Sequence, residues 1–337
     1  MKDWNGFIEL IKKVASIMER NSGQAILQFS PGQWKIANPF GIVKGEAEWE
    51  GGTLAVAAMD FVTVASPLVA RGDIAVSKKD SKVVIRCGKF SGSLPAITNP
   101  FEDEPESGIE FQPLGEELIE SADIVSTYTS TDLSSPELSS IHVTGEAAEA
   151  TNRQVWVSVK APGPGDFLLP LKHLALILAL GPKGAEIGLS SDAIHCKCER
   201  GAFVGATVVG QFPDTPDLGE GIAVEIDRES LTTAVGTISQ IVGGKMEALI
   251  SFSFPRKGML VLSAEYKGGT IRERVQCKGD TEEINDFRAL LPFLSFASDY
   301  APESDKDITI LCYPGKCVFW ESGDYSIMSG VTYAAEV

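Results

Sequence analysis

The stretch DFRALLPFLSFASDYAPESDKDITILCYPGKCVFWESGDYSIMSGV, residues 286–331, decides the fold because its pattern occurs three times in the chain. An Asp-Phe pair leads into an apolar helical stretch, a turn follows, and alternating strands then run to a glycine. The same order begins at Asp166 and at Asp60, so the phenylalanines stand 120 and 106 residues apart (287 − 167 and 167 − 61). This period is too long for a solenoid, whose repeats are about 20 to 50 residues. The pattern therefore predicts a triplicated domain.

Each copy is preceded by an amphipathic helix, in which apolar residues recur at spacings of three and four. The apolar positions of these three helices are Phe7, Ile8, Leu10, Ile11, Val14, Ile17 and Met18, then Leu114, Leu118, Ile119 and Val125, then Leu231, Val235, Ile238 and Val242. Asp227 is the expected N-cap of the third helix. Alternating segments such as QVWVSVK (154–160) and MLVLSAEY (259–266) predict strands.

The predicted fold class is α+β, with three tandem domains over residues 1–107, 108–218 and 219–337. In each domain an antiparallel sheet is covered on one face by two helices, which is the natural packing for this order of elements.

Composition limits the possible functions. The 337 residues carry 46 acidic against 29 basic side chains, a net charge of −17, which disfavours indiscriminate tight binding to nucleic acid. The charge does not exclude a local basic surface. No apolar run of about 18 residues predicts a membrane span. Because the start MKDWNGFIELIKK mixes charged and apolar residues, it does not read as a signal peptide, and we expect a cytoplasmic protein.

The cysteines do not form a recognisable metal or disulfide pattern. Six cysteines in 337 residues are too sparse for a disulfide framework. Cys196 and Cys198 share one strand face, but no second close pair completes a four-ligand zinc site. Cys312 and Cys317 flank a Pro-Gly turn. We expect buried free thiols, no metal and no cofactor.

Catalysis is not indicated. The three histidines, His142, His173 and His195, lie on different predicted elements, and APGPG (161–165) lacks the lysine and following helix of a phosphate-binding loop. The acidic run Glu102, Asp103 and Glu104 could bind a cation, but like charges between domains usually form a solvated linker.

Three stretches give the chain a resemblance to a known family. They are GKFSGSLPAI (88–97) with the acidic NPFEDEPESG after it, ATNRQVWVSVK (150–160) and VVGQFPDTPDL (208–218). The chain resembles the bacterial sliding clamp, the β subunit of DNA polymerase III. The first stretch looks like the end of the clamp's first domain, and the second is similar to the family's Ala-Thr-Asp-Gly-His-Arg-Leu segment. The third is similar to the Gly-x-Phe-Pro-Asp segment that leads into the third domain.

This resemblance implies a head-to-tail homodimer that closes into a six-domain ring around double-stranded DNA, with helices lining the hole. Such a clamp is a processivity factor without chemistry of its own, which tethers a DNA polymerase and is opened by a separate ATP-driven clamp loader. The residues expected to face DNA are Lys12, Lys13, Arg20, Arg71, Lys172, Arg228, Lys245 and Arg288. Against this, the predicted helix in LGEELIESAD (114–123) is acidic.

The resemblance also implies a hydrophobic pocket between the second and third domains, which receives short linear motifs of the polymerase and the loader. The residues carried over to that pocket are Thr151, Gln154, Val155, Trp156, Pro216, Leu218, Tyr325, Ile327 and Met328. The family's Gly-His-Arg run is replaced by Arg153-Gln154-Val155, and the chain continues past Met328, where the tail could lie in or beside the pocket. Trp156 and Met328 could instead be plain core residues on alternating strands.

A non-enzymatic structural or adaptor protein, for instance a β-rich virion component, is the alternative. Two helices on the same side of every sheet favour the clamp. The amount of divergence would fit a viral clamp.

Overall fold

The computed structural model describes residues 3–20, 22–97, 108–243 and 247–333. The chain forms two compact units, one made of Met1–Glu120 with Leu168–Val209 and the other of Ser121–Phe167 with Gly210–Val337. Lys245 and the acidic run Glu102 to Glu104 lie outside the described residues.

The first unit contains an eight-stranded sheet that joins distant parts of the chain, in the order β4-β1-β2-β3-β15-β14-β13-β8, and a separate sheet β5-β6-β7. Its strands are β1 (Ile26–Ser30), β2 (Gln33–Asn38), β3 (Gly41–Glu46), β4 (Leu54–Ala57), β5 (Ala75–Lys79), β6 (Lys82–Cys87), β7 (Phe90–Pro95), β8 (Gln112–Pro113), β13 (Glu186–Leu189), β14 (Ala193–Cys198) and β15 (Gly201–Ala206). The join is the antiparallel pairing of β3 with β15, where Val43 lies opposite Phe203.

The second unit contains the sheet β12-β9-β10-β11-β23-β22-β21-β16-β19-β18-β17-β20-β24. Its strands are β9 (Ser140–Val143), β10 (Ala147–Thr151), β11 (Val155–Lys160), β12 (Phe167–Pro170, at the boundary between the units), β16 (Ile222–Asp227), β17 (Leu249–Arg256), β18 (Met259–Tyr266), β19 (Gly269–Gly279), β20 (Phe287–Leu290), β21 (Asp307–Tyr313), β22 (Cys317–Ser322), β23 (Tyr325–Gly330) and β24 (Thr332–Tyr333). Here β11 pairs with β23, which places Trp156 opposite Met328.

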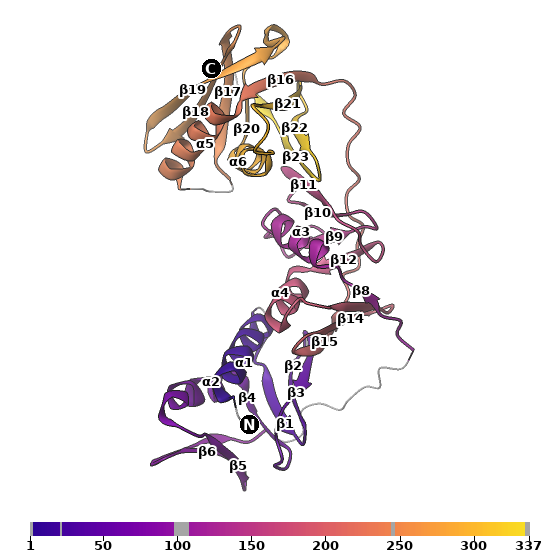
Figure 1. The fold of residues 1–337 in the computed structure, drawn as a ribbon, viewed down its shortest axis with the longest axis vertical. Coiled ribbons are helices and arrows are strands. Elements are labelled where there is room, and N and C mark those ends of the chain that lie inside the picture. The colour runs from indigo at the N-terminus through magenta and orange to yellow at the C-terminus, as the bar shows by residue number, and fades with distance from the viewer. Residues whose placement is uncertain (1–2, 21, 98–107, 244–246, 334–337) are drawn as a thin grey trace. The chain divides into compact units, whose positions relative to one another are not determined.

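The helices cover one face of these sheets. They are α1 (Trp4–Glu19), α2 (Ala58–Ala65) with the 3₁₀ turn η1 (Ser66–Arg71), α3 (Glu116–Ser126), α4 (Leu171–Leu180), α5 (Arg228–Val242) and α6 (Leu291–Tyr300), with a second 3₁₀ turn η2 (Thr281–Glu283). In the first unit α1 packs against α2, α4 and β2; in the second, α5 packs against α6, β18 and β19 (Figure 1). The core lies between each helix layer and its sheet.

The amphipathic patterns explain this packing. Five of the seven apolar positions predicted for α1 are buried, with Ile11, Val14 and Met18 fully excluded from solvent, while Phe7 and Ile17 are partly buried. Helix α5 begins where predicted, because Asp227 accepts a hydrogen bond from the Ser230 amide (2.9 Å). That hydrogen bond lowers the pKa of the Asp227 carboxyl, as expected for a carboxylate at a helix N-terminus.

The repeat is present, but the predicted alignment of its copies was wrong by several residues. Phe167 and Phe287 open the short strands β12 and β20, and helices α4 and α6 begin four residues later. In the first copy the matching strand is β4, which begins at Leu54, whereas Phe61 already lies inside α2. The structural period between the first two copies is therefore 113 residues (167 − 54), close to the 120 between the second and third.

The strand pairs whose register is described are antiparallel, which agrees with the predicted α+β class. None of the helices in the described residues has both the length and the apolar character needed to cross a membrane.

Candidate functional site

A row of side chains crosses the second unit's sheet on the face opposite α6, here called the outer face. Residues directly opposite each other in antiparallel strands share a face. Thr151 lies opposite Trp156, Trp156 opposite Met328, Met328 opposite Phe319, and Phe319 opposite Leu311. Trp156, Met328, Phe319 and Leu311 are each only partly buried. These four residues form a continuous band, here called the apolar stripe, with Thr151 at one end.

The turn before β11 fixes the position of Trp156. Asn152 Oδ1 accepts hydrogen bonds from the amides of Gln154 (3.0 Å) and Val155 (2.8 Å). The Thr151 hydroxyl donates to the Val155 carbonyl (2.8 Å). The indole Nε1 of Trp156 is buried and has no hydrogen-bond partner within the described residues. The protein itself covers this nitrogen, so Trp156 contributes apolar ring surface to the stripe and not its N–H group.

Three of the predicted pocket residues lie on the face opposite to the apolar stripe. The side chains of Val155 and Ile327 are at most 1% exposed to solvent. They lie on the side covered by α6, because successive side chains of a strand point to opposite faces. Tyr325 lies on that side as well and stacks on Tyr300 of α6, with ring centroids 4.7 Å apart. Val155 and Ile327 belong to the core and Tyr325 is partly buried, so none of the three is part of the apolar stripe.

Of the other predicted pocket residues, Thr151, Trp156 and Met328 lie on the outer face. Gln154 is exposed at the edge of the stripe, and Pro216 and Leu218 belong to the segment Gly210–Gly221, here called the linker. The Lys316 ammonium donates to the Leu218 carbonyl (3.2 Å). Phe319 and Leu311, which the sequence did not single out, complete the stripe.

The chain after Met328 does not follow the stripe. Thr332 and Tyr333 form β24, which pairs with Arg288 and Phe287 of β20. The possibility that the tail occupies the pocket is therefore not supported for residues up to 333.

The solvent-facing side of α1 carries the first group of predicted basic residues. Lys12, Lys13 and Arg20 are exposed at or just after this helix, and Arg71 is exposed at the end of η1. The exposed side of α3 is acidic instead, with Glu116, Glu117, Glu120 and Asp123. The exposed helical surface is therefore of mixed charge.

The remaining basic residues have other positions. Lys172 donates to the Ser22 hydroxyl and lies over the Phe40 ring, and burial lowers its pKa. Arg228 donates to the Pro302 carbonyl (2.8 Å). Arg288 belongs to β20 opposite Ser251, on the face away from the buried Phe287 and Ala289. It therefore does not lie on the helical face.

The cysteines are free, as expected. Cys196 and Cys198 have their sulfur atoms 3.8 Å apart. Burial raises the pKa of Cys312 to about 12 and that of Cys317 to about 11, so both thiols are held protonated. No cluster of metal-binding side chains occurs in the part of the chain that the structure describes.

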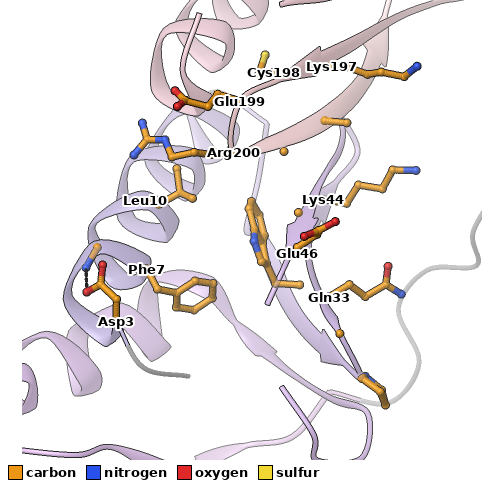
Figure 2. A pocket seen from close by; sticks show the side chains of 17 residues that line it. Asp3, Phe7, Leu10, Gln33, Lys44, Glu46, Lys197, Cys198, Glu199 and Arg200 are labelled. Carbon is orange, nitrogen blue, oxygen red and sulfur yellow. Dashed lines mark hydrogen bonds between the residues drawn. The ribbon is translucent and has the colours of Figure 1, made fainter. Parts of the chain in front are cut away.

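A cavity of about 1060 Å³ lies in the first unit between α1, the strands β2 and β3, and the turn from β14 to β15 (Figure 2). Phe7 and Leu10 of α1 point into it. Two of its three lining cations are engaged by the chain itself: Arg200 donates to the Ala179 carbonyl (2.6 Å), and Lys197 lies 3.8 Å from the Glu186 carboxylate. The cavity is therefore a poor fit for an anionic ligand.

Several strands lie at sheet edges among the described residues, and two of these edges are β7 and part of β19. In the first unit β7 pairs only with β6. In the second unit residues 269–275 of β19 pair only with β18, since β16 covers just the end of the strand from Cys277. Free edges of this length readily accept a strand of another chain.

The sequence matches no known protein-family model and no curated protein. Solved structures match it over its whole length. The DNA polymerase sliding clamp from Caulobacter crescentus is similar, with a TM-score of 0.79, 15% identity and 98% of each chain covered. DNA polymerase III subunit beta from Borrelia burgdorferi is similar with a TM-score of 0.77 and 12% identity, and 98% of each chain is covered. The DNA polymerase III beta subunit from Thermotoga maritima is similar with a TM-score of 0.75 and 15% identity, and 97% of each chain is covered.

These similarities confirm the predicted resemblance and the fold class. The chain has the fold of the bacterial DNA polymerase III beta subunit from one end to the other.

Proposed function

We propose that this protein is a DNA sliding clamp. Two copies would close head to tail into a ring around double-stranded DNA, and the ring would tether a replicative polymerase in the cytoplasm. In this role the protein performs no reaction itself, and an ATP-driven clamp loader opens the ring. We keep the division into domains 1–107, 108–218 and 219–337 as part of the proposal.

The observation that supports this proposal most is the fold likeness, which spans 98% of both this chain and a solved sliding clamp at 15% identity. A topological function depends on complete architecture more than on individual side chains, because a closed ring retains DNA without tight contacts. The net charge of −17 is compatible with such a role.

Ring closure would use the edges of β7 and β19. An antiparallel pairing of β7 of one copy with residues 269–275 of β19 of the other continues both sheets, and two such contacts close a dimer. Electron microscopy of the purified protein tests the proposal. Closed rings with a hole wider than a DNA duplex are expected, and open filaments or compact monomers would overturn it.

Replacing Ile271 by Asp should dissociate the dimer. Ile271 is partly buried on the free edge of β19, and a carboxylate there would have to be desolvated in the contact. A cost of about 3 kcal/mol corresponds to a more than hundredfold rise in the dissociation constant. Analytical ultracentrifugation should show a shift from twice the 36.0 kDa chain mass to the chain mass.

The matched control is Gln276→Asp, which adds the same charge at an exposed position of the same strand. Its sedimentation should match that of the unsubstituted protein. Equal dissociation of the two variants would show that charge alone, and not this edge, controls assembly.

The helical face would line the hole. Lys12, Lys13, Arg20 and Arg71 are the basic residues best placed to contact phosphates, while α3 contributes carboxylates. We therefore propose a lining that holds DNA loosely, so that retention depends mainly on ring closure.

The double variant Lys12→Glu, Lys13→Glu should weaken binding of a short DNA duplex about tenfold at low salt. It should also flatten the dependence of affinity on salt by about one unit of slope per lost phosphate contact. Fluorescence anisotropy at several salt concentrations measures both effects. The double variant Lys82→Glu, Arg86→Glu is the control, since it makes the same change of net charge on the exposed face of β6. An equal loss in the control would mean that the helical face is not the DNA-binding surface.

The apolar stripe would receive the linear motif of the polymerase or loader, with Thr151 and Gln154 at one end and the linker as a wall. A partly exposed band of large apolar side chains suits a peptide that inserts apolar anchors.

A further inference from the structure

His142 of β9 bridges two carboxylates and stacks on the linker. Its Nδ1 lies 3.0 Å from Glu149 Oε2, and its Nε2 lies 3.0 Å from Asp166 Oδ1. The imidazole stacks on the ring of Phe212, with centroids 4.6 Å apart and planes inclined by 25°. Phe212 is only 8% exposed. These four residues are here called the clasp.

The arrangement requires a charged imidazole. A carboxylate can only accept a hydrogen bond, so two carboxylates need two N–H donors, and only the imidazolium has both. In the neutral ring one nitrogen would present its lone pair to a carboxylate. The charged groups that face the ring are Glu149 from β10 and Asp166 from the segment before β12, while the linker contributes the Phe212 ring.

The clasp lies next to the apolar stripe on the same outer face. Glu149, opposite His142, is two residues from Thr151 along β10. Two residues along a strand correspond to about 7 Å. At its other end the linker is held by Lys316, which lies in the turn between β21 and β22. The Lys316 ammonium donates a hydrogen bond to the Leu218 carbonyl. Between these two anchors the linker contains no helix or strand (Figure 1).

We propose that His142 is a positioning residue that holds the linker beside the apolar stripe as a wall of the peptide site, and that deprotonation of its ring loosens this wall. The proposal deepens the proposed function, on which the peptide site depends, but the state of the linker can be measured without any peptide.

The direction of the pH effect follows from the contacts. The hydrogen bond to Glu149 is the largest cause that raises the pKa of His142 above 6.5, and Asp166 adds to it. A raised pKa in the closed state means that protonation stabilises this state. The stabilisation is complete below the pKa of the free ring and is lost as the pH rises through the higher pKa of the clasp. The linker should therefore be held more tightly at pH 6 than at pH 9.

Limited proteolysis of the linker by a broad-specificity protease tests the clasp directly. After correction for the pH dependence of the protease on an unstructured peptide, protection of residues 211–218 against cleavage should fall about tenfold between pH 6 and pH 9, the loss expected for one charge-assisted hydrogen bond. His142→Leu should show the low protection at both values. His142→Arg should keep high protection at both, since a guanidinium stacks on aromatic rings and donates to two carboxylates without titrating in this range.

Ser326→Ala is the matched control, because Ser326 lies on the same face and its hydroxyl contacts only the Ser158 carbonyl (3.5 Å). Its linker protection should change with pH as in the unsubstituted protein. A pH-independent linker in the unsubstituted protein, or equal pH dependence in His142→Leu, would overturn the proposal.

The second readout is the affinity for labelled hexapeptides with two leucine or phenylalanine anchors. At pH 6, His142→Leu should bind these peptides about tenfold more weakly than the unsubstituted protein, because it lacks the hydrogen bond that holds the linker. His142→Arg should bind them as the unsubstituted protein does. If linker protection follows the prediction but the unsubstituted protein binds no such peptide, the proposed peptide site is wrong. The pH-dependent hold of His142 on the linker is then supported without it. If peptide binds equally well to all variants, His142 does not position that site.

Discussion

Replacing Trp156 by Ala is expected to weaken binding of a peptide with two apolar anchors at least thirtyfold, while the protein stays folded and assembled. Trp156 is the largest side chain of the apolar stripe and lies between Thr151 and Met328. Tryptophans in such positions contribute about 2 to 4 kcal/mol to binding, and 2 kcal/mol corresponds to about thirtyfold. Fluorescence anisotropy of labelled hexapeptides measures the loss.

The fold should tolerate this change because Trp156 faces outward. The neighbouring core residues, Val155 and Val157, face α6 and are not touched by it. Tyr266→Ala removes another partly exposed aromatic ring, outside the stripe, and should bind peptide normally. Trp156→Phe should lose about threefold to tenfold, since it keeps an aromatic ring but offers a smaller apolar surface to the peptide. Normal binding by Trp156→Ala would show that the peptide site lies elsewhere.

The sequence predicted the architecture because that information is local. The 3.6-residue period of α1 and α5, the cap at Asp227 and the alternation in β11 and β18 each depend on neighbouring residues only. The alignment of the repeats was wrong for a related reason. Four-residue strands such as β12 and β20 are too short to show a period, so the sequence pattern assigns them to the first turn of the helices that follow. The same pattern assigns Arg288 to a helix, whereas it lies in β20.

The candidate site could be predicted only in part because it depends on non-local pairing. Trp156 and Met328 are 172 residues apart (328 − 156), and their contact exists because β11 pairs with β23. The register of the hairpin from β21 to β22 then adds Leu311 and Phe319, which no sequence pattern indicates. By contrast, strand alternation alone predicts that Val155 is not part of the stripe, because Val155 and Trp156 are adjacent in one strand and cannot share a face.

His173 is the residue whose environment the sequence did not reveal at all. It lies in α4, is fully buried, and packs between Phe40 (5.1 Å between ring centroids) and Phe203 (5.2 Å). Neither ring nitrogen has a hydrogen-bond partner among the described residues. A Cβ at Gly205 would lie 2.2 Å from His173 Nε2, so the ring fits only because residue 205 is glycine. Burial, with a smaller contribution from Lys172, lowers the pKa of His173 to about 4.

This depressed pKa predicts that the first unit loses stability in mild acid. Above pH 6.5 the ring is neutral in both the folded and the unfolded chain, so it has no effect on the pH dependence. As the pH falls from 6.5 toward 4, the unfolded chain binds a proton that the folded chain does not, and the free energy of unfolding falls. The shift from 6.5 to about 4 corresponds to a loss of about 3 kcal/mol. Urea unfolding at pH 7.5 and pH 4.5, followed by hydrogen exchange of amides in α4 and β15, measures it.

His173→Leu separates this effect from the titration of the carboxylates, which remain the same in both proteins. The variant fills the space between Phe40 and Phe203 with an apolar side chain and removes two unpartnered nitrogens, so it should be at least as stable as the original protein at pH 7.5. Between pH 7.5 and pH 4.5 it should lose about 3 kcal/mol less than the original, since no proton is taken up at residue 173 on unfolding. An equal loss in both proteins would mean that the folded protein accepts a proton on His173. The ring would then have to leave its site between the two phenylalanines in acid, and exchange of the α4 amides would rise at pH 4.5 in the original protein alone.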